Sequence, residues 1–423
     1  MSIARRGPIV ASSALAALLL AGCSTGTQSA SVSLESCETD GVTLAVAAPP
    51  TAAAALEIAV ATFEAEHPGL TVSTTELAGA SYNEYAQQII GDLAAGVQVD
   101  VANVGHDQVR LFVDSYDVRP FDTQLLHDSY DESFLPIGVV GADQYAIPFQ
   151  VSIAGLYRNL DALAAAGIDT DEPLESLDDV IAQAQAYTTA TGTPALGIDQ
   201  GVGADDWYSQ MLTQSLGGEF VEEGAPAFDS EAGVEAFTFW SSGSEGFMTR
   251  AAATDTIGGF VTGATPMLVI STAAVPLFTS QVADAFEWDM QAFPASSQAR
   301  YAAGGNSWVA IADDDCRAAL GQAFIAEVVG TDALLATLTG YGYLPVDEAA
   351  RTTLMTDPAT DARTVALYER DDIVMTPFGG WPGSTTPEVQ RAIADMVDRI
   401  MAGADVADEL ASTQQQIEGI VGR

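Results

Sequence analysis

The sequence contains no lysine: all 14 of its basic residues are arginines, and they stand against 58 acidic residues. A protein that binds nucleic acid needs a basic face to displace the counterions of the phosphates, so this composition excludes nucleic acid as a partner. Anionic lipid headgroups are disfavoured for the same reason. The acidic surface indicates a soluble, self-repelling chain and identifies no ligand.

Histidine and cysteine are equally scarce, at three residues each. No two histidines have the spacing of metal ligands, and no serine lies in a complete nucleophile-elbow motif. A thiol enzyme is a poor fit with so few cysteines. Acid pairs of the kind that glycosidases use do not stand out in so acidic a chain. We therefore expect no enzyme activity, cofactor or metal site, with an exported hydrolase as a minor alternative.

Long apolar runs are missing except for residues 9–20, which follow two arginines near the N-terminus. This run is shorter than the about 20 residues of a membrane-spanning helix, and its flanks are those of an export signal. It ends in Leu-Ala-Gly before Cys23, which resembles a bacterial lipoprotein signal. We expect a signal peptide over 1–22 and a lipid on Cys23 that anchors the protein at the extracellular face of the cytoplasmic membrane. An ordinary signal with an incidental cysteine is the alternative.

Residues 23–39 are mostly Ser, Thr, Gly and Ala, and we expect a flexible tether there. If Cys23 is acylated, Cys37 and Cys316 remain, an even number in an oxidising compartment. A disulfide between them is the favoured interpretation. Two unpaired thiols stay open as the alternative, because sequence spacing does not show that the two residues meet.

Strand-like and helix-like segments alternate after the tether. Strands are expected at 42–47, 71–76 and 99–104, because these segments are apolar or alternate in polarity. Between them lie two helical patterns, and the second begins at a capping box from Ser81 to Glu84. The β-α-β-α-β order predicts a mainly parallel sheet flanked by helices. The length of 423 residues suggests two domains.

Several short fragments occur in one order along the chain: FEAEHPGLTV at 63–72, LAAG at 93–96, IPF at 147–149, LYRN at 156–159, GG at 304–305 and YLPV at 343–346. In this order and spacing they resemble the extracellular solute-binding proteins of ABC importers, the large carbohydrate-binding family that includes maltose-binding proteins. Arg158 departs from the family pattern, which commonly has tyrosine there.

The resemblance implies an α/β fold of two lobes, each discontinuous in sequence, with a ligand bound between them by hinge closure. The N-terminal lobe would hold residues 40–150 and 265–312, and the C-terminal lobe 151–264 and 313–423. It also implies a monomer without cofactors, whose partners are a carbohydrate and the permease subunits of an ABC transporter.

A sugar site needs aromatic platforms and polar side chains that satisfy hydroxyl groups. Glu76 and Asp107 each follow a predicted strand, where ligands of open α/β sheets bind, although either could be a surface carboxylate. Trp207 follows a glycine-rich loop. Asn306 and Ser307 follow two glycines that allow close approach of the backbone.

Three further candidates rest on the resemblance: Gln150 and Ser152 lie where similar proteins contact ligand at the first crossing between lobes, and Tyr343 matches an aromatic residue of their cleft. Trp381 lies in an irregular glycine-rich loop, where an exposed tryptophan suggests a binding site. The other tryptophans, Trp240, Trp288 and Trp308, are expected in the core.

The sequence thus predicts a lipid-anchored sugar-binding protein of an ABC importer. Some fragments, such as Pro148-Phe149 and Thr339-Gly340, resemble binding proteins for glycerol phosphates, so that ligand or another polyol is the alternative. A phosphate site would need an arginine fork or several backbone amides, and the loop around Trp381 has no arginine. A neutral mono- or oligosaccharide is therefore favoured. A structural lipoprotein is the remaining non-enzyme alternative.

Overall fold

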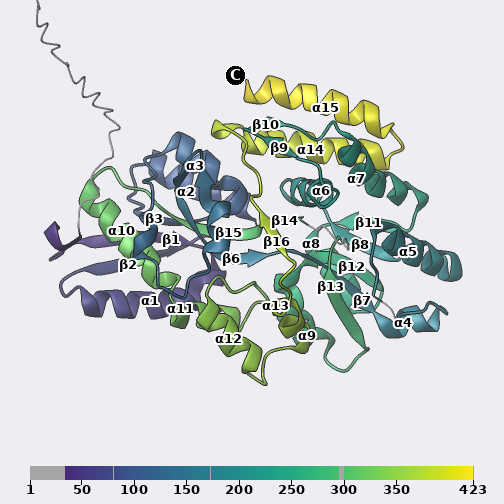
Figure 1. Ribbon diagram of the computed structural model, residues 1–423, viewed down its shortest axis with the longest axis horizontal. Coiled ribbons are helices and arrows are strands. Elements are labelled where there is room, and N and C mark those ends of the chain that lie inside the picture. Colours follow the sequence, from purple (N-terminus) through teal and green to yellow (C-terminus); the bar gives the residue numbers. More distant parts are fainter. Residues whose placement is uncertain (1–33, 80, 172, 295–299, 423) are drawn as a thin grey trace, which may run out of the picture. The chain divides into compact units, whose positions relative to one another are not determined.

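The computed structural model describes residues 34–79, 81–171, 173–294 and 300–422 (Figure 1). The expected signal peptide, the lipidated Cys23 and most of the tether lie outside these residues. Within them, no single helix is long and apolar enough to cross a membrane. One helix pair, Asp315–Val328 with Thr331–Leu338, passes that test only when taken together, and it is bent by 57°.

The first sheet has the strand order β2-β1-β3-β15-β6. Its strands are β1 (Thr43–Ala48), β2 (Thr71–Glu76), β3 (Val101–Gly105), β6 (Ala146–Ser152) and β15 (Gly304–Ala310). The three strands predicted from the sequence are all present within two residues. β1 runs parallel to β2 and β3, whereas β15 runs antiparallel to β3 and β6.

Four helices belong with this sheet: α1 (Ala53–Glu66), α2 (Tyr82–Ala94), α10 (Asp315–Val328) and α11 (Thr331–Leu338). α1 packs against α10 and α11, and α2 packs against β3. The predicted capping box is present, since the Ser81 hydroxyl accepts a hydrogen bond from the Glu84 amide at 3.3 Å. A short helix, α3 (Val109–Ser115), follows β3.

The second sheet has the order β11-β8-β12-β7-β13. Its strands are β7 (Ala154–Asn159), β8 (Leu196–Asp199), β11 (Met248–Ala251), β12 (Met267–Ser271) and β13 (Trp288–Ala292). β8 pairs in parallel with β11 and β12, and β7 pairs antiparallel with β12 and β13. Each sheet thus contains parallel pairs and one strand that runs back, β15 in the first and β7 in the second. Both of these strands follow a crossing of the chain between the sheets.

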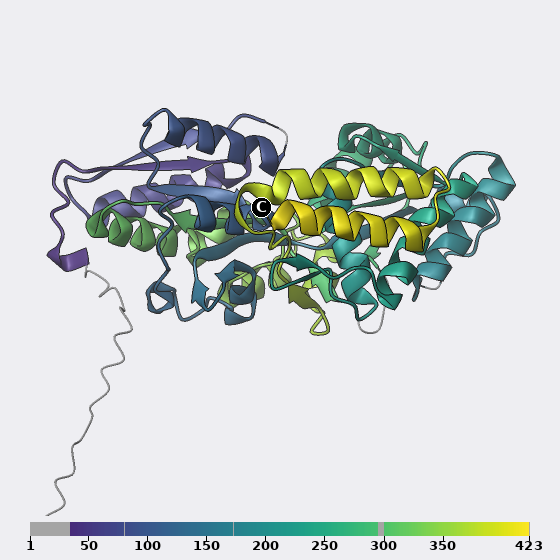
Figure 2. The same ribbon diagram turned by 90° about the horizontal axis from the view of Figure 1, so that it is seen from above.

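The helices between and after these strands are α4 (Leu160–Ala165), α5 (Leu177–Thr191), α6 (Ala204–Ser215), α7 (Glu231–Ser242), α8 (Ala253–Val261), α9 (Val275–Val282), α12 (Glu348–Thr356), α13 (Ala362–Tyr368), α14 (Thr386–Met401) and α15 (Val406–Val421). α14 and α15 lie side by side in both views (Figures 1 and 2) and pack against α7. α14 also packs against α6, which positions the site described below.

Three pairs of short strands complete the fold. β14 (Arg300–Ala302) pairs with β16 (Val374–Thr376), β4 (Val139–Val140) with β5 (Asp143–Gln144), and β9 (Val221–Glu222) with β10 (Ala225–Pro226). The three tryptophans expected in the core are buried: Trp240 and Trp308 are 0% exposed and Trp288 is 5% exposed.

The division of the chain between the two sheets differs from the predicted one in two places. β12 and β13 fall in the range 265–312, which was assigned to the first lobe, but they belong to the second sheet. α10 and α11 were assigned to the second lobe but pack against α1. The sequence of an apolar strand does not show to which of two sheets it belongs, because that depends on the strands with which its backbone pairs.

Two long-range contacts agree with this division of the chain: an ion pair within the second sheet and a disulfide at the first. Arg158 of β7, the residue that departs from the family pattern, pairs with Asp289 of β13 at 2.5 Å and thereby joins two neighbouring strands of the second sheet. In the structure Cys37 and Cys316 form a disulfide across 279 residues. This bond joins the start of the described chain to α10, on the first sheet.

Candidate functional site

Polar side chains gather where the first sheet meets α6 and α14. We call this group the polar junction. From the first sheet and its helices come Tyr82, Asn83, His106, Asp107, Gln108, Gln150, Asn306 and Ser307, and from α6 and α14 come Asp206, Ser209, Gln210 and Gln390. All are buried except Tyr82 and Asn83, which are half-buried. Because buried polar groups are costly unless they are hydrogen-bonded, such a concentration indicates a binding site.

Amide side chains form the part of the junction on the first sheet. Asn306 donates from Nδ2 to Gln150 Oε1 at 2.7 Å and to Tyr82 Oη at 3.0 Å. Gln150 is held in turn by Thr51, whose hydroxyl donates to Gln150 Oε1 at 3.0 Å, and it donates to the Thr337 hydroxyl at 3.0 Å. The Asn306 and Gln150 side chains are therefore oriented before any ligand binds.

Gly305 makes this arrangement possible. Its φ is +115°, and a Cβ at this position would lie 1.9 Å from the carbonyl oxygen of Gln150. The pairing register of β15 and β6 shifts directly afterwards, between Asn306 and Ser307. A glycine is thus required for β15 to approach β6 so closely, as expected for the Gly304-Gly305 pair.

Two buried carboxyl groups lie at the junction. Asp107, in the 3-10 helix His106–Gln108 that follows β3, accepts hydrogen bonds on Oδ2 from Gln108 at 2.7 Å and Gln390 at 2.8 Å. Asp206, on α6, accepts one on Oδ2 from the Trp381 indole at 3.4 Å. Burial raises the pKa of both carboxyl groups; that of Asp206 reaches about 7, and the charge of Asp107 contributes to this rise.

His106, next to Asp107 in the same 3-10 helix, is a neutral imidazole. Burial lowers the pKa of its side chain to about 3. Its Nδ1 is hydrogen-bonded to the Ser307 hydroxyl at 2.8 Å. The ring can therefore offer hydrogen bonds but supplies no positive charge to the junction near neutral pH.

Gln390 joins the two sides of the junction, and it was not among the residues predicted from the sequence. It donates to Asp107 and accepts from Asn83 Nδ2 at 3.1 Å. It lies on the buried face of α14 with Thr386, Val389 and Ile393. Their helical spacing is visible in the sequence, so a glutamine on a mostly apolar stripe was the signal that could have found it. Asp206, also missed, had no such signal on α6, whose residues 205–215 are all buried.

The predicted site residues are placed as follows. Asp107, Gln150, Asn306 and Ser307 belong to the polar junction. Trp207 borders it, and its Nε1 donates to the Ala302 carbonyl at 2.8 Å. The Trp207 ring and the Ser152 hydroxyl both lie against Gly304. A Cβ on Gly304 would be 2.6 Å from the indole and 3.0 Å from that hydroxyl.

Three predicted residues lie at or beyond the edge of the junction. Tyr343 is buried and close enough to the Tyr82 hydroxyl to affect the pKa of both phenols. Trp381 was expected to be exposed but is fully buried, because its ring packs edge-on against Phe220 and its indole points to Asp206. Glu76 ends β2, an edge strand, and is exposed outside the buried network.

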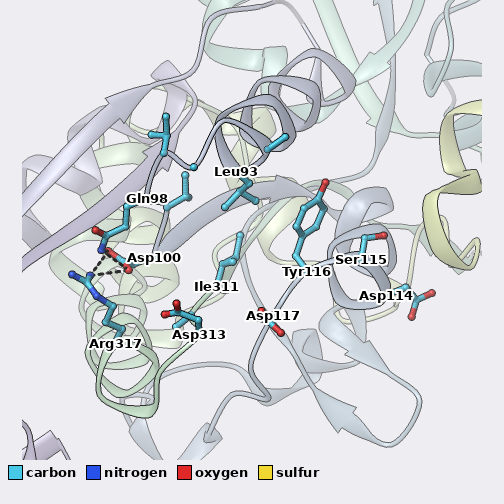
Figure 3. Close-up of a pocket in the computed structure, with 15 residues that line it drawn as sticks. Leu93, Gln98, Asp100, Asp114, Ser115, Tyr116, Asp117, Ile311, Asp313 and Arg317 are labelled. Atoms are coloured by element: carbon cyan, nitrogen blue, oxygen red, sulfur yellow. Dashed lines mark hydrogen bonds and ion pairs between the residues drawn. The ribbon is translucent and has the colours of Figure 1, made fainter.

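A separate hollow of about 750 Å³ lies at the other end of β3 (Figure 3). It is bordered by the end of α2, the segment that leads into β3, the end of α3 and the residues after β15. Its arginine, Arg317, pairs with Asp100 at 2.9 Å. Because β3 runs from this hollow to His106, the hollow and the polar junction lie at opposite ends of the strand. Among the described residues, no cluster of His, Cys, Asp or Glu is arranged to hold a metal ion.

Gly379 offers a test of how tightly the loop before α14 must approach Asp107. Its φ is +79°, and a Cβ would lie 2.8 Å from the Asp107 Cα. We expect Gly379→Ala to lower the free energy of unfolding by about 2–3 kcal/mol, from backbone strain plus this collision. Gly192→Ala is the matched control, since Gly192 has φ +77° and no atom lies within 4 Å of the position that a Cβ would take. If urea denaturation gives the same loss of unfolding free energy for both variants, the close approach of Gly379 to Asp107 does not contribute to stability.

The whole chain can be compared with known proteins. Residues 47–334 match the family described as bacterial extracellular solute-binding protein. Among solved structures, the cyclic alpha-maltosyl-1,6-maltose binding protein from Arthrobacter globiformis has a TM-score of 0.73 at 19% identity, covering 90% of this chain and 99% of that one. UgpB from Mycobacterium tuberculosis, in complex with glycerophosphocholine, has a TM-score of 0.72 at 21% identity, covering 89% and 98%. These likenesses establish the two-lobe α/β fold.

A curated relative is more similar in sequence but over a shorter stretch. The probable amino-acid ABC transporter periplasmic-binding protein of Sinorhizobium fredii is 27% identical over 198 residues, which is 43% of this chain and 44% of the relative. The match thus spans less than half the length of that relative.

Proposed function

Because the chain belongs to the bacterial extracellular solute-binding protein family, we propose that it captures a sugar or related polyol outside the cell and delivers it to the permease of an ABC importer. The observation that supports a polyhydroxylated ligand best is the polar junction itself. Its amides, carboxyls and hydroxyls can both donate to and accept from sugar hydroxyls. Trp207 and Trp381 border it and can cover apolar C–H faces.

The contacts across the junction suggest how ligand binding would favour a closed form that the permease can recognise. Gln390 on α14 bonds to Asn83 and Asp107 on the side of the first sheet, so these contacts form only when the two sides are together. A ligand that bonds to both sides would favour this arrangement over an open one. The permease would then recognise the closed form, and no covalent step is needed.

An anionic ligand fits the junction less well. Among the described residues, no arginine is hydrogen-bonded to a member of the polar junction, and two carboxyl groups lie within it. A glycerol phosphate would therefore meet negative charge without a compensating fork. Glycerol phosphates, the alternative that the sequence left open, nevertheless belong in the ligand screen. So do glycerophosphocholine, with which UgpB was solved, and amino acids, for which the Sinorhizobium fredii relative is named.

A thermal-shift screen of the purified protein against sugars, polyols, amino acids and glycerol phosphates tests the proposal. A ligand that binds only the folded state stabilises it by about 2.7 kcal/mol at a hundredfold excess over Kd. Gln150→Ala should lose the shift measured against its own baseline, whereas Gln415→Ala, on the exposed face of α15, should keep it. A shift with glycerol phosphate or amino acids alone would overturn the sugar proposal.

Anchoring by a lipid on Cys23 is part of the same proposal. We expect Cys23→Ser to move the protein from the membrane fraction to the medium, since one or more acyl chains supply the membrane affinity that this acidic chain lacks. Cell fractionation with an immunoblot measures this directly. An unchanged membrane fraction would mean that another segment holds the protein there.

A further inference from the structure

Two neighbouring carboxyl groups on α6 have opposite surroundings. Asp205 pairs with Arg250 at 2.6 Å, and Arg250 also lies over the Trp240 ring. Asp206, the next residue, points to the polar junction and is fully buried. No basic side chain is paired with Asp206 among the described residues. The fold thus neutralises one of the two charges internally and leaves the other facing the site.

The hydrogen bonding of Asp206 is also incomplete. Its Oδ2 accepts the long bond from the Trp381 indole, and a hydrogen bond with the Gln390 side chain also lowers the pKa of the carboxyl group. Its Oδ1, although buried, has no hydrogen-bond partner in the described part of the chain, and the same holds for Gln108 Oε1, Ser209 Oγ and His106 Nε2. The hydroxyl and the nitrogen of a neutral imidazole can donate or accept. An amide oxygen and a carboxylate oxygen only accept. The junction therefore lacks donors more than it lacks acceptors.

The charges around Asp206 also show that a positively charged group is missing from the described part of the junction. Burial raises the pKa of Asp206, and the negative charge of Asp107 raises it further. The other titratable groups around them supply no positive charge: His106 is neutral, and the phenols of Tyr82 and Tyr343 stay protonated. On the side of α6, Asp199 is hydrogen-bonded to Tyr208, and Asp205 is bound to Arg250.

We infer that the ligand carries a protonated amine on a sugar or polyol frame, and that this ammonium group binds to the carboxylates of Asp107 and Asp206. An ammonium group has three donors and no acceptor, which matches the unpartnered oxygens, and its charge replaces the basic partner that Asp206 lacks. This inference deepens the proposed function and rests on it.

A neutral sugar and an ammonium ligand should bind to different protonation states of Asp206. A hydroxyl group can donate to Asp206 but leaves the charges of two buried carboxylates uncompensated, so a neutral ligand would bind while Asp206 keeps its proton. An ammonium ligand would instead bind to the ionised form. Binding near pH 7 would then release a proton from Asp206, which calorimetry in buffers of different ionisation enthalpy detects.

The experiment compares matched pairs by isothermal titration calorimetry at pH 7: glucosamine with glucose, galactosamine with galactose, and 1-amino-1-deoxysorbitol with sorbitol. We expect one amine to bind at least tenfold more tightly than its neutral counterpart, with proton release. Asp206→Asn and, separately, Asp107→Asn should reduce this preference to less than threefold. Asp395→Asn, which removes the same charge from an exposed position on α14, should keep it.

The outcomes separate the inference from the function on which it rests. Binding of a neutral sugar with no preference for its amine would overturn the inference and leave the proposed function standing. A preference that survives both Asp206→Asn and Asp107→Asn, with each variant folded by circular dichroism, would also overturn it. Failure of every sugar and polyol, amines included, would overturn both.

Discussion

Lowering the pH from 8 to about 5 is expected to raise the free energy of unfolding by about 2 kcal/mol. The reason lies in the buried carboxyl groups of α6. Burial raises the pKa of Asp206 to about 7 and that of Asp205 to about 6, although Arg250 partly offsets the rise at Asp205. Between the ordinary value of 3.8 and these values, the folded state binds more protons than the unfolded chain. Stability therefore falls as the pH rises through this window.

His106 has the opposite effect and limits the stability that is gained as the pH falls. Its pKa is lowered from 6.5 to about 3, so its contribution is lost as the pH falls below about 6.5. Over the range from pH 8 to pH 5, Asp206 contributes about 3 kcal/mol and Asp205 about 1 kcal/mol, against about 2 kcal/mol from His106. Relief of the repulsion within this acidic chain adds to the gain.

Urea denaturation at pH 8, 6.5 and 5 measures this dependence. Asp206→Asn should abolish the gain between pH 8 and 6.5, because Asp206 is its main source there while His106 opposes it. The exposed Asp395→Asn should follow the parent protein. Stability that rises with pH over this range, or an unchanged slope in Asp206→Asn, would contradict the assignment of a raised pKa to this carboxyl group.

Removal of the disulfide by Cys37→Ser with Cys316→Ser is expected to lower the free energy of unfolding by about 4 kcal/mol. The bond closes a loop with a sequence separation of 279 residues, so it restricts the unfolded chain strongly. It also holds the start of the described chain against α10. In the absence of the bond, we expect this N-terminal segment to detach before the sheets unfold.

Urea denaturation of the double variant, with and without reductant, tests this prediction. Cys23→Ser is the matched control, because it removes a cysteine that lies outside the disulfide. Reductant should destabilise the control and leave the double variant unchanged. If the double variant unfolds at the same urea concentration as the control, the bond contributes no stability.

Much of the architecture was predictable from local patterns. Apolar or alternating segments located β1, β2 and β3, and the Ser81–Glu84 box located the start of α2, because these signals lie within a few residues of one another. Seven of the nine predicted ligand-binding residues lie in or against the polar junction, namely Asp107, Gln150, Ser152, Trp207, Asn306, Ser307 and Trp381. They follow strands, glycines or a crossing between lobes, and that they bind a ligand stays a prediction.

The failures share a cause. The sequence placed Trp381 on the surface because its loop is irregular, but the burial of a loop depends on what packs over it, here Phe220 and Asp206. Likewise, β12 could not be assigned to a sheet from its own residues. Gln390 and Asp206 were missed because their partners lie far away along the chain.

The sequence by itself determined the class of the protein: its acidic character, the export signal expected from it, the α/β alternation and the family to which it belongs. Only the tertiary structure decided which carboxyl group faces the site and which is neutralised. Asp205 and Asp206 are adjacent in sequence, yet Arg250 lies beside one and Trp381 beside the other. Successive residues on a helix point about 100° apart, and the partners that each meets come from distant segments brought together by packing.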